Sequence, residues 1–326
     1  MNNSIAKKES SKNGLIELFR FLCSVWVAYF HGFFPVLSDK FNGENISVDF
    51  FFMVSGLFFL KSMDKYREAP LGEGIKAIFW SRNKKIIVPL TIAALSILYC
   101  NIAFPLEFNG FNWPLSFLWF FAAQFVYLSL LFMIYKNVKR RSTFNIICAI
   151  IACACISLCM FDLKQFYRVA RGPGMIAIGI LVSQIPKIKL KSERISMLVN
   201  SLGFVISAAA FIYLAYLPGA DTGRAHLFLC VVCPALLYFA TALPVRSKFL
   251  NLLGEFSVFI YLAQLPILLH HFYVSRDTRD QFPLLCICAL GMFIINRIVN
   301  KIQQNKTAKR SAVFINLQIL ICRCVS

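Results

Sequence analysis

Three ionisable side chains, Glu17, Arg20 and His31, lie within one long apolar stretch near the start of the sequence. In a helix, Glu17 and Arg20 are three residues apart and therefore adjacent on one face. Arg20 and His31 are eleven residues apart, which puts them on one face to within about 20° and roughly 16 Å apart along the axis. Such a stripe should face the interior of a helix bundle, where an imidazole can act as an acid–base catalyst. Two other interpretations stay open: an interfacial ion pair for Glu17 and Arg20, and a structural role for the histidine.

Asp49 stands at the start of a second apolar run, NISVDFFFMVSGLFFL. One interpretation is a carboxylate near a helix start, where the helix dipole favours negative charge. The other interpretation depends on depth. If the first apolar helix ends and the second begins on the outer side, Asp49 and His31 lie at a similar level. Asp49 could then orient the imidazole or accept its proton.

A basic cluster, Arg82, Lys84 and Lys85, leads into the third apolar run. Such a cluster usually flanks a membrane span on the cytoplasmic side. At a helix start it can also bind phosphate, because the guanidinium and the backbone amides of the first turn both favour anions. The cluster alone does not separate these two roles.

The composition indicates that a membrane surrounds these residues. Hydrophobic residues make up 59% of the 326 residues and charged residues only 15%, whereas a soluble domain carries about 25% charged residues. The apolar residues come in blocks near the roughly 20 residues that a spanning helix needs. The net charge of +19 would suggest nucleic acid in a soluble protein. Here the basic residues lie between apolar blocks, as the positive-inside rule predicts, so we expect no nucleic-acid partner.

Ten candidate spans predict an all-α integral membrane protein with a bundle of about ten transmembrane helices. Their ranges are 15–37, 46–60, 86–104, 114–135, 144–161, 172–186, 195–217, 226–244, 253–273 and 282–300. Lys and Arg total 26 in the predicted inner segments, against 7 in the predicted outer loops 38–45, 105–113, 162–171, 218–225 and 274–281. This asymmetry predicts that both chain ends lie in the cytoplasm and that the protein sits in the cytoplasmic (inner) membrane.

The chain divides into a cytoplasmic tail 1–14, a transmembrane domain 15–301 and a second cytoplasmic tail 302–326. The first tail is polar and has no cleavable signal pattern. The second tail contains a short apolar stretch, which we expect to lie on the membrane surface. The cysteines are mostly in apolar segments, where free Cys packs as a small hydrophobe. A lone CxxC at Cys230 and Cys233 is too little for a ligand set, so no metal site is predicted.

Four sequence blocks together resemble the membrane acyltransferase 3 family. Glu17, then Arg20, ten residues and His31 are similar to the acid, Arg and His of the family's first span. VDFFFMVSG, starting at Val48, resembles the family's V-D-x-F-F-x-x-S-G block. The run from Arg82 to Pro89 is similar to its R-x-x-R followed by Ile and Pro. LGEFSVFIYLAQLP, residues 253–266, resembles its L-G-x-x-S-x-x-x-Y-L-x-H-x-P block.

The chain departs from the family pattern at three positions. Glu17 stands where Asp is usual, which preserves the charge. Lys85 stands where the second Arg is expected, which keeps the charge but loses the bidentate grip on phosphate. Gln264 replaces the His of the last block, and His270 and His271, two turns further on, do not fill that position.

The resemblance implies an acyl-coenzyme A-dependent O-acyltransferase that modifies sugars of surface polysaccharides. Arg82 and Lys85 would hold the phosphates of acyl-coenzyme A, acetyl-coenzyme A in the first instance, at the cytoplasmic mouth. The pantetheine arm would pass Arg20 and bring the thioester to His31. His31 would act as general base on a sugar or glycan hydroxyl that enters from outside, with Asp49 holding the imidazole and Glu17 beside Arg20. An acyl-His intermediate is a second route.

Several alternatives remain open at this stage. Succinyl or a longer acyl group could replace acetyl, and the acceptor could be a small hydroxylated compound. A secondary transporter or flippase would share the ten spans, the intramembrane charges and the Gly/Pro-interrupted segment 172–179. A non-catalytic assembly partner would agree with Gln264. The oligomeric state is open, a homo-oligomer included.

Overall fold

The computed structural model describes residues 12–29, 43–83, 87–103, 112–160, 164–216, 223–273 and 282–302. Within these ranges every regular element is a helix and there is no β-strand. The helices are α1 Gly14–Ala28, α2 Gly43–Leu57, α3 Phe59–Met63, the 3-10 turn η3 Asp64–Tyr66, α4 Leu71–Asn83, α5 Ile87–Ala103, α6 Asn112–Asn137, α7 Arg141–Met160, α8 Lys164–Gln184, α9 Glu193–Tyr216, α10 Gly223–Ala242, α11 Lys248–Tyr273 and a last helix, Phe282–Ile302. The all-α prediction is confirmed for these residues.

Each predicted span overlaps a helix of this structure, and the second overlaps both α2 and α3. Residues 30–37 of the first predicted span lie outside the described residues. Among the described residues, four helical segments are long and apolar enough to cross a membrane: Trp119–Asn137, Arg141–Leu158, Glu193–Tyr216 and Phe282–Ile302. A fifth crossing results if Ile46–Leu57 and Phe59–Tyr66, bent by 46° at Phe58, count as one broken span. The chain is therefore a multi-pass membrane protein, while ten crossings with both ends in the cytoplasm stay a prediction.

Close contacts give the relative directions of neighbouring helices. Asp49 of α2 pairs with Arg171 of α8, and further along both helices Gly56 lies against Ile176. Because the residue numbers of the contacting pairs increase in both helices, α2 and α8 run parallel. By the same criterion α1 and α11 are parallel, because Gly14 lies against Leu250 and Glu17 against Gly254. In contrast, α7 and α8 are antiparallel: Arg141 donates to Gln184 over 3.1 Å and Gly174 lies against Cys155. Ten alternating crossings would require these same directions.

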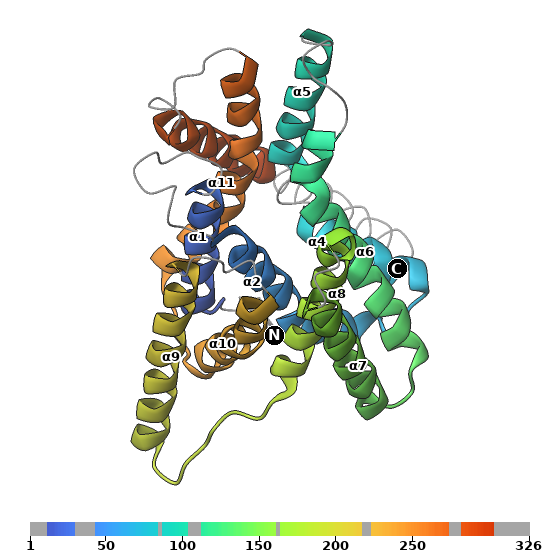
Figure 1. Cartoon of the computed structure of the whole chain (residues 1–326), viewed down its shortest axis with the longest axis vertical. Coiled ribbons are helices and arrows are strands. Elements are labelled where there is room, and N and C mark those ends of the chain that lie inside the picture. The colour runs from blue at the N-terminus through green and yellow to red at the C-terminus, as the bar shows by residue number, and fades with distance from the viewer. Residues whose placement is uncertain are drawn as a thin grey trace, which may run out of the picture.

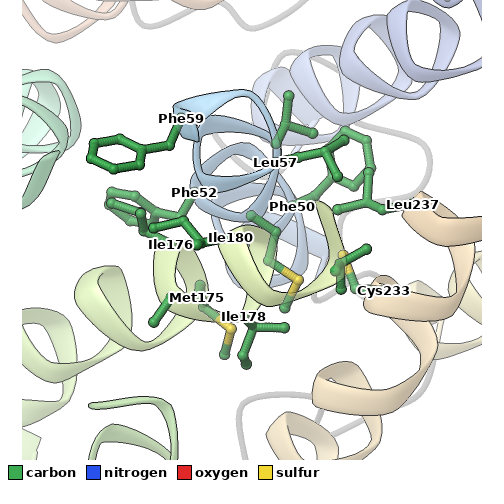
Figure 2. Packing of buried hydrophobic residues seen from close by; sticks show 14 of the residues in the cluster. Phe50, Phe52, Leu57, Phe59, Met175, Ile176, Ile178, Ile180, Cys233 and Leu237 are labelled. Carbon is green, nitrogen blue, oxygen red and sulfur yellow. The ribbon is translucent and has the colours of Figure 1, made fainter. Parts of the chain in front are cut away.

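The main core forms around the parallel pair α2 and α8, which lies between α1 and α7 in the bundle (Figure 1). A side chain at Gly56 would overlap the backbone of Ile176, and one at Gly179 would overlap the backbone of Met53. Such close approach is how membrane helices gain packing energy, because lipid offers no hydrophobic drive between them. Figure 2 shows side chains that fill the space around this contact, from α2, α3, α8 and α10.

A second, smaller core joins α5, α11 and the helix Phe282–Ile302. Its fully buried members include Ala93, Leu262, Ala263 and Ala289, each 0% exposed. Val27 and Ala28, at the end of α1, also belong to this cluster, while Ile16, Phe19 and Cys23 of the same helix belong to the main core. Helix α1 therefore connects the two cores.

The segment 61–85, between the second and third predicted spans, contains helices. It holds the end of α3, η3 and α4, and α4 packs along α6 with Gly74 against the Phe132 ring and Phe79 5.5 Å from Phe125. Ile75, Ile78 and Phe79 follow a helical spacing and give α4 an apolar stripe. The interspersed charges lower the mean hydropathy of this amphipathic helix, so it was not among the predicted spans.

Hydrogen bonds connect the C-terminal ends of several helices to neighbouring segments. Tyr135 of α6 donates to Asp64, and Arg67 donates to the carbonyls of Val138 and Lys139, both over 2.8 Å. After α8, Lys187 donates to Thr241 of α10. Burial lowers the pKa of Lys187 from the usual lysine value, because a partly desolvated ammonium is disfavoured.

Candidate active site

Glu17 and Arg20 form an ion pair on α1, as their spacing predicts. Arg20 Nη1 donates to Glu17 Oε2 over 2.9 Å and to Oε1 over 3.2 Å. The two residues differ in exposure: the Glu17 side chain is 7% exposed and the Arg20 side chain 30%. The carboxylate is thus anchored in the protein, and the guanidinium reaches a surface where a ligand or solvent can approach.

Gly254 of α11 provides the space that Glu17 occupies. A methyl group at position 254 would overlap both the carboxylate and the Cβ of Glu17. One turn later, Ser257 donates to the carbonyl of Gly254 over 2.7 Å. The glycine of the LGEFS block is therefore the residue that lets α11 approach the acid of the first-span block.

The start of α1 is held by Asn13, which orients Glu17 toward α11. The Asn13 side-chain oxygen accepts from the amides of Leu15 and Ile16, as an N-cap does. Its side-chain nitrogen donates to the carbonyls of Ala240 and Leu243, over 2.7 and 2.8 Å. This one residue caps α1 and attaches it to the end of α10.

Glu255, the neighbour of Gly254, carries a separate and more exposed ion cluster. It accepts from Lys12 over 2.9 Å and from Arg297 over 3.2 Å, with all three side chains at least 35% exposed. The cluster links the chain before α1, α11 and the helix Phe282–Ile302 at one end of the bundle.

Asp49 of α2 lies in the interior and pairs with Arg171 of α8. Its side chain is 0% exposed and that of Arg171 is 2% exposed, and Arg171 Nε donates to Asp49 Oδ1. Residue 171 was predicted to lie in the outer loop 162–171, which is wrong, because α8 begins at Lys164 and buries this arginine. The missed signal was an arginine directly before Gly172, Pro173 and Gly174, at the edge of an apolar run.

Two further polar contacts connect α2 to its neighbours near this pair. The Cys23 thiol of α1 and the Ser47 side chain share a hydrogen bond. On the next turns of α2, Gln124 of α6 donates to Ser55, and Ser55 donates to the carbonyl of Phe51 over 2.8 Å. Helix α2 thus has a polar link to α1, to α6 and to α8.

Gln264, which stands where the family pattern has His, is completely buried in α11. Near it, the ring of Tyr261 contacts Phe120 and Phe121 of α6 at 6.2 and 5.6 Å. The last block of α11 therefore runs from Gly254, beside Glu17, to a polar amide in the protein interior.

The other predicted site residues fall outside the described part. His31 and Lys85 lie outside the described residues. Arg82 belongs to the last turn of α4, but its side chain is also outside the described part. Among the residues that are described, no three His, Cys, Asp or Glu side chains gather in a way that could hold a metal ion.

The family comparison covers all four sequence blocks. The family model described as an acyltransferase domain, acyltransferase 3, matches residues 13–305, nearly the whole chain. No curated protein and no solved structure matches the chain. With its apolar helices and this match over Glu17, Asp49 and the block around Gly254, the chain belongs to the acyltransferase 3 family.

Proposed function

We propose that this membrane acyltransferase moves an acyl group, acetyl in the first instance, from cytosolic acyl-coenzyme A to a hydroxyl of a sugar in a lipid-linked or extracytoplasmic glycan. One observation carries the proposal. Blocks far apart in the sequence meet around α1. Glu17 packs against Gly254 of α11, and Cys23 is hydrogen-bonded to Ser47 of α2, two residues before Asp49. This arrangement places the Glu17–Arg20 pair and the buried Asp49 on two contacting helices of an apolar bundle, α1 and α2, where charged groups are costly and usually functional.

Arg20 is the described residue best suited to contact the donor. Its guanidinium is held by Glu17 on one side and is 30% exposed on the other. A cation with one anchored edge can contact an anionic or carbonyl group without losing its position. Arg82 and Lys85 would hold the phosphates, Lys85 as a point charge and Arg82 as a planar fork.

His31 is the proposed general base. Its imidazole would take the proton of the acceptor hydroxyl while that oxygen bonds to the thioester carbonyl carbon. The carbon–sulfur bond then breaks, and the departing coenzyme A sulfur takes the proton from the imidazolium. In a second route, the acyl group would first transfer to the imidazole and then to the acceptor. Asp49 would offset the positive charge that develops on His31 in either route.

One of the features that favoured the transporter alternative, the Gly/Pro-interrupted segment 172–179, is a continuous helix. Transporters bind substrate at broken helices near the middle of the membrane. Here α8 runs from Lys164 to Gln184 as one helix, with Pro173 inside it. The glycines of this segment provide close packing instead, Gly172 against Tyr127 and Gly174 against Cys155.

The test is acyl transfer by the full-length protein purified in detergent. We expect release of free coenzyme A from acetyl-coenzyme A and incorporation of radiolabelled acetyl into total membrane glycan. His31→Ala should lower the rate at least about 100-fold, the contribution of a general base. Tyr135→Phe is the matched control, because it removes only the hydrogen bond to Asp64. Full activity of His31→Ala would reject the proposed base, and an inactive wild-type protein would reject the proposed reaction.

A further inference from the structure

The Asp49–Arg171 pair is the most deeply buried ion pair among the described residues. Both side chains are at most 2% exposed, whereas in each of the other described pairs at least one partner is 30% exposed or more. Arg171 belongs to none of the four family-like blocks, and the reaction outlined above assigns it no role. A charge buried to this degree calls for a physical reason.

Stability alone is a weak reason for a buried ion pair. Removing two charges from water costs free energy that their attraction only partly returns, so apolar residues of the same volume often stabilise as well or better. In a bilayer, inserting a helix with apolar residues at these positions would also cost less free energy than inserting one with charged residues. The pair therefore suggests a task that an apolar contact between α2 and α8 could not perform.

The position of Arg171 is set by three close contacts of α8. Gly172 lies against the ring of Tyr127 in α6, Gly174 against Cys155 in α7, and Gly179 against the backbone of Met53 in α2. Pro173 has no amide hydrogen for the carbonyl one turn earlier, yet the helix continues through it. α8 is thus held on three sides within ten residues, and Arg171 is held with it.

Asp49 is the residue that gains from this rigid partner. It stands on α2 between Ser47, which is bonded to Cys23 of α1, and Phe50, whose ring lies 6.2 Å from Phe19 of α1. The carboxylate therefore lies close to α1, the helix that carries Glu17 and Arg20. Because Arg171 binds one of its oxygens, the rotation of the Asp49 side chain is restricted.

We propose that Arg171 is a positioning residue that acts through Asp49. It holds the Asp49 carboxylate in one orientation inside the bundle, so that this acid meets the reacting groups in a prepared geometry. The inference rests on the proposed function, and it adds a residue on α8 to a site otherwise built from α1, α2 and α11. Displacement of a catalytic group by about 1 Å can cost 100-fold in rate, so the expected effect is large.

The test compares Arg171→Gln, Arg171→Met and Arg171→Lys in the detergent-purified, full-length protein. For each variant, kcat and the KM for acetyl-coenzyme A are measured per folded molecule, together with thermal unfolding. We expect Arg171→Gln and Arg171→Met to lower kcat about 10- to 100-fold with the donor KM changed less than about 3-fold. The kcat of Arg171→Lys should lie between the kcat of these two variants and that of the wild type, because lysine keeps the charge but not the guanidinium geometry.

A purely structural role makes a different prediction. It would lower the unfolding temperature but leave kcat per folded molecule at the wild-type value in all three variants, and that result would overturn the inference. Gly56→Ala is the stability control, since it strains the same helix pair without touching either charge. If only Arg171→Lys folds, a kcat below that of Gly56→Ala at unchanged donor KM supports the proposal, and an equal kcat overturns it.

The same assay separates this inference from the proposed function. An active wild type with unaffected Arg171 variants rejects only the role of Arg171. An inactive wild type rejects the reaction and, with it, the positioning role.

Discussion

The α1–α11 pair and the α2–α8 pair each bring two parallel helices together at glycines, and each contains an ion pair. In the first, Gly254 makes room for Glu17, and the partner cation Arg20 is on the same helix and 30% exposed. In the second, Gly56 and Gly179 bring two backbones into contact, and the charges of Asp49 and Arg171 come from different helices and are buried.

The difference concerns what each cation can still contact. Arg20 is anchored through one nitrogen and keeps an open side, so it can bind a substrate and release it. Arg171 is enclosed, so it can act only on the residues around it, Asp49 among them. We infer that the first pair contacts a ligand directly, while the second supports a group that does.

The largest expected effect comes from the same amide substitution at the two carboxylates. Asp49→Asn leaves the buried guanidinium of Arg171 without its counter-charge and should cost about 3–5 kcal/mol in free energy of unfolding. Glu17→Gln should cost less than about 1 kcal/mol, because Arg20 can recover hydration. Thermal unfolding in detergent measures both.

A control strengthens this first comparison. The double variant Asp49→Asn with Arg171→Met no longer contains the cation, so it should recover much of the free energy of unfolding that Asp49→Asn loses. If Asp49→Asn and Glu17→Gln lower the free energy of unfolding equally, the different exposure of the two ion pairs does not affect their contribution to stability.

The second expected effect concerns Gly254→Ala, which should separate α1 from α11. The added methyl group overlaps Glu17, so we expect a loss of about 1–3 kcal/mol from overpacking and a higher KM for acetyl-coenzyme A as Arg20 shifts. Adding Glu17→Ala should recover part of the stability, since the overlap with the carboxylate disappears while that with Cβ stays. Gly72→Ala is the control, because its surroundings are open. A Gly254→Ala protein as stable as Gly72→Ala would rule out the tight contact.

Hydropathy and spacing predicted much of this architecture. Each of the ten predicted spans overlaps a helix among the described residues, and the adjacency of Glu17 and Arg20 followed from helical geometry alone. These features depend on residues close in the sequence, whose relation is fixed by one helix. Hydropathy did not indicate α4, because charges interrupt its apolar stripe: Lys76 lies between Ile75 and Ile78.

The partner of Asp49 required information that local patterns do not contain. Arg171 lies 122 residues further along the chain, and the positive-inside count treats any arginine at the edge of a span as a loop residue. The glycines are a similar case. In the sequence, Gly56 and Gly179 look like flexible positions. Only the structure shows that each lies against the backbone of the partner helix.

The smallest expected effect belongs to the exposed ion cluster at the rim of the α1–α11 pair. Lys12→Met removes one of two cations from Glu255, where the side chains of Lys12 and Glu255 are 35% and 41% exposed. Arg297 remains on the carboxylate at 3.2 Å, so the cost should be at most about 1 kcal/mol and should shrink in high salt as the charges are screened. Acyl transfer should be unchanged, because Lys12 contacts neither Glu17 nor Arg20 through a described ion pair. Unfolding at low and at 1 M salt measures the effect. A loss above about 2 kcal/mol, or one that high salt does not reduce, would mean that the rim cluster determines the α1–α11 contact as strongly as Gly254 does.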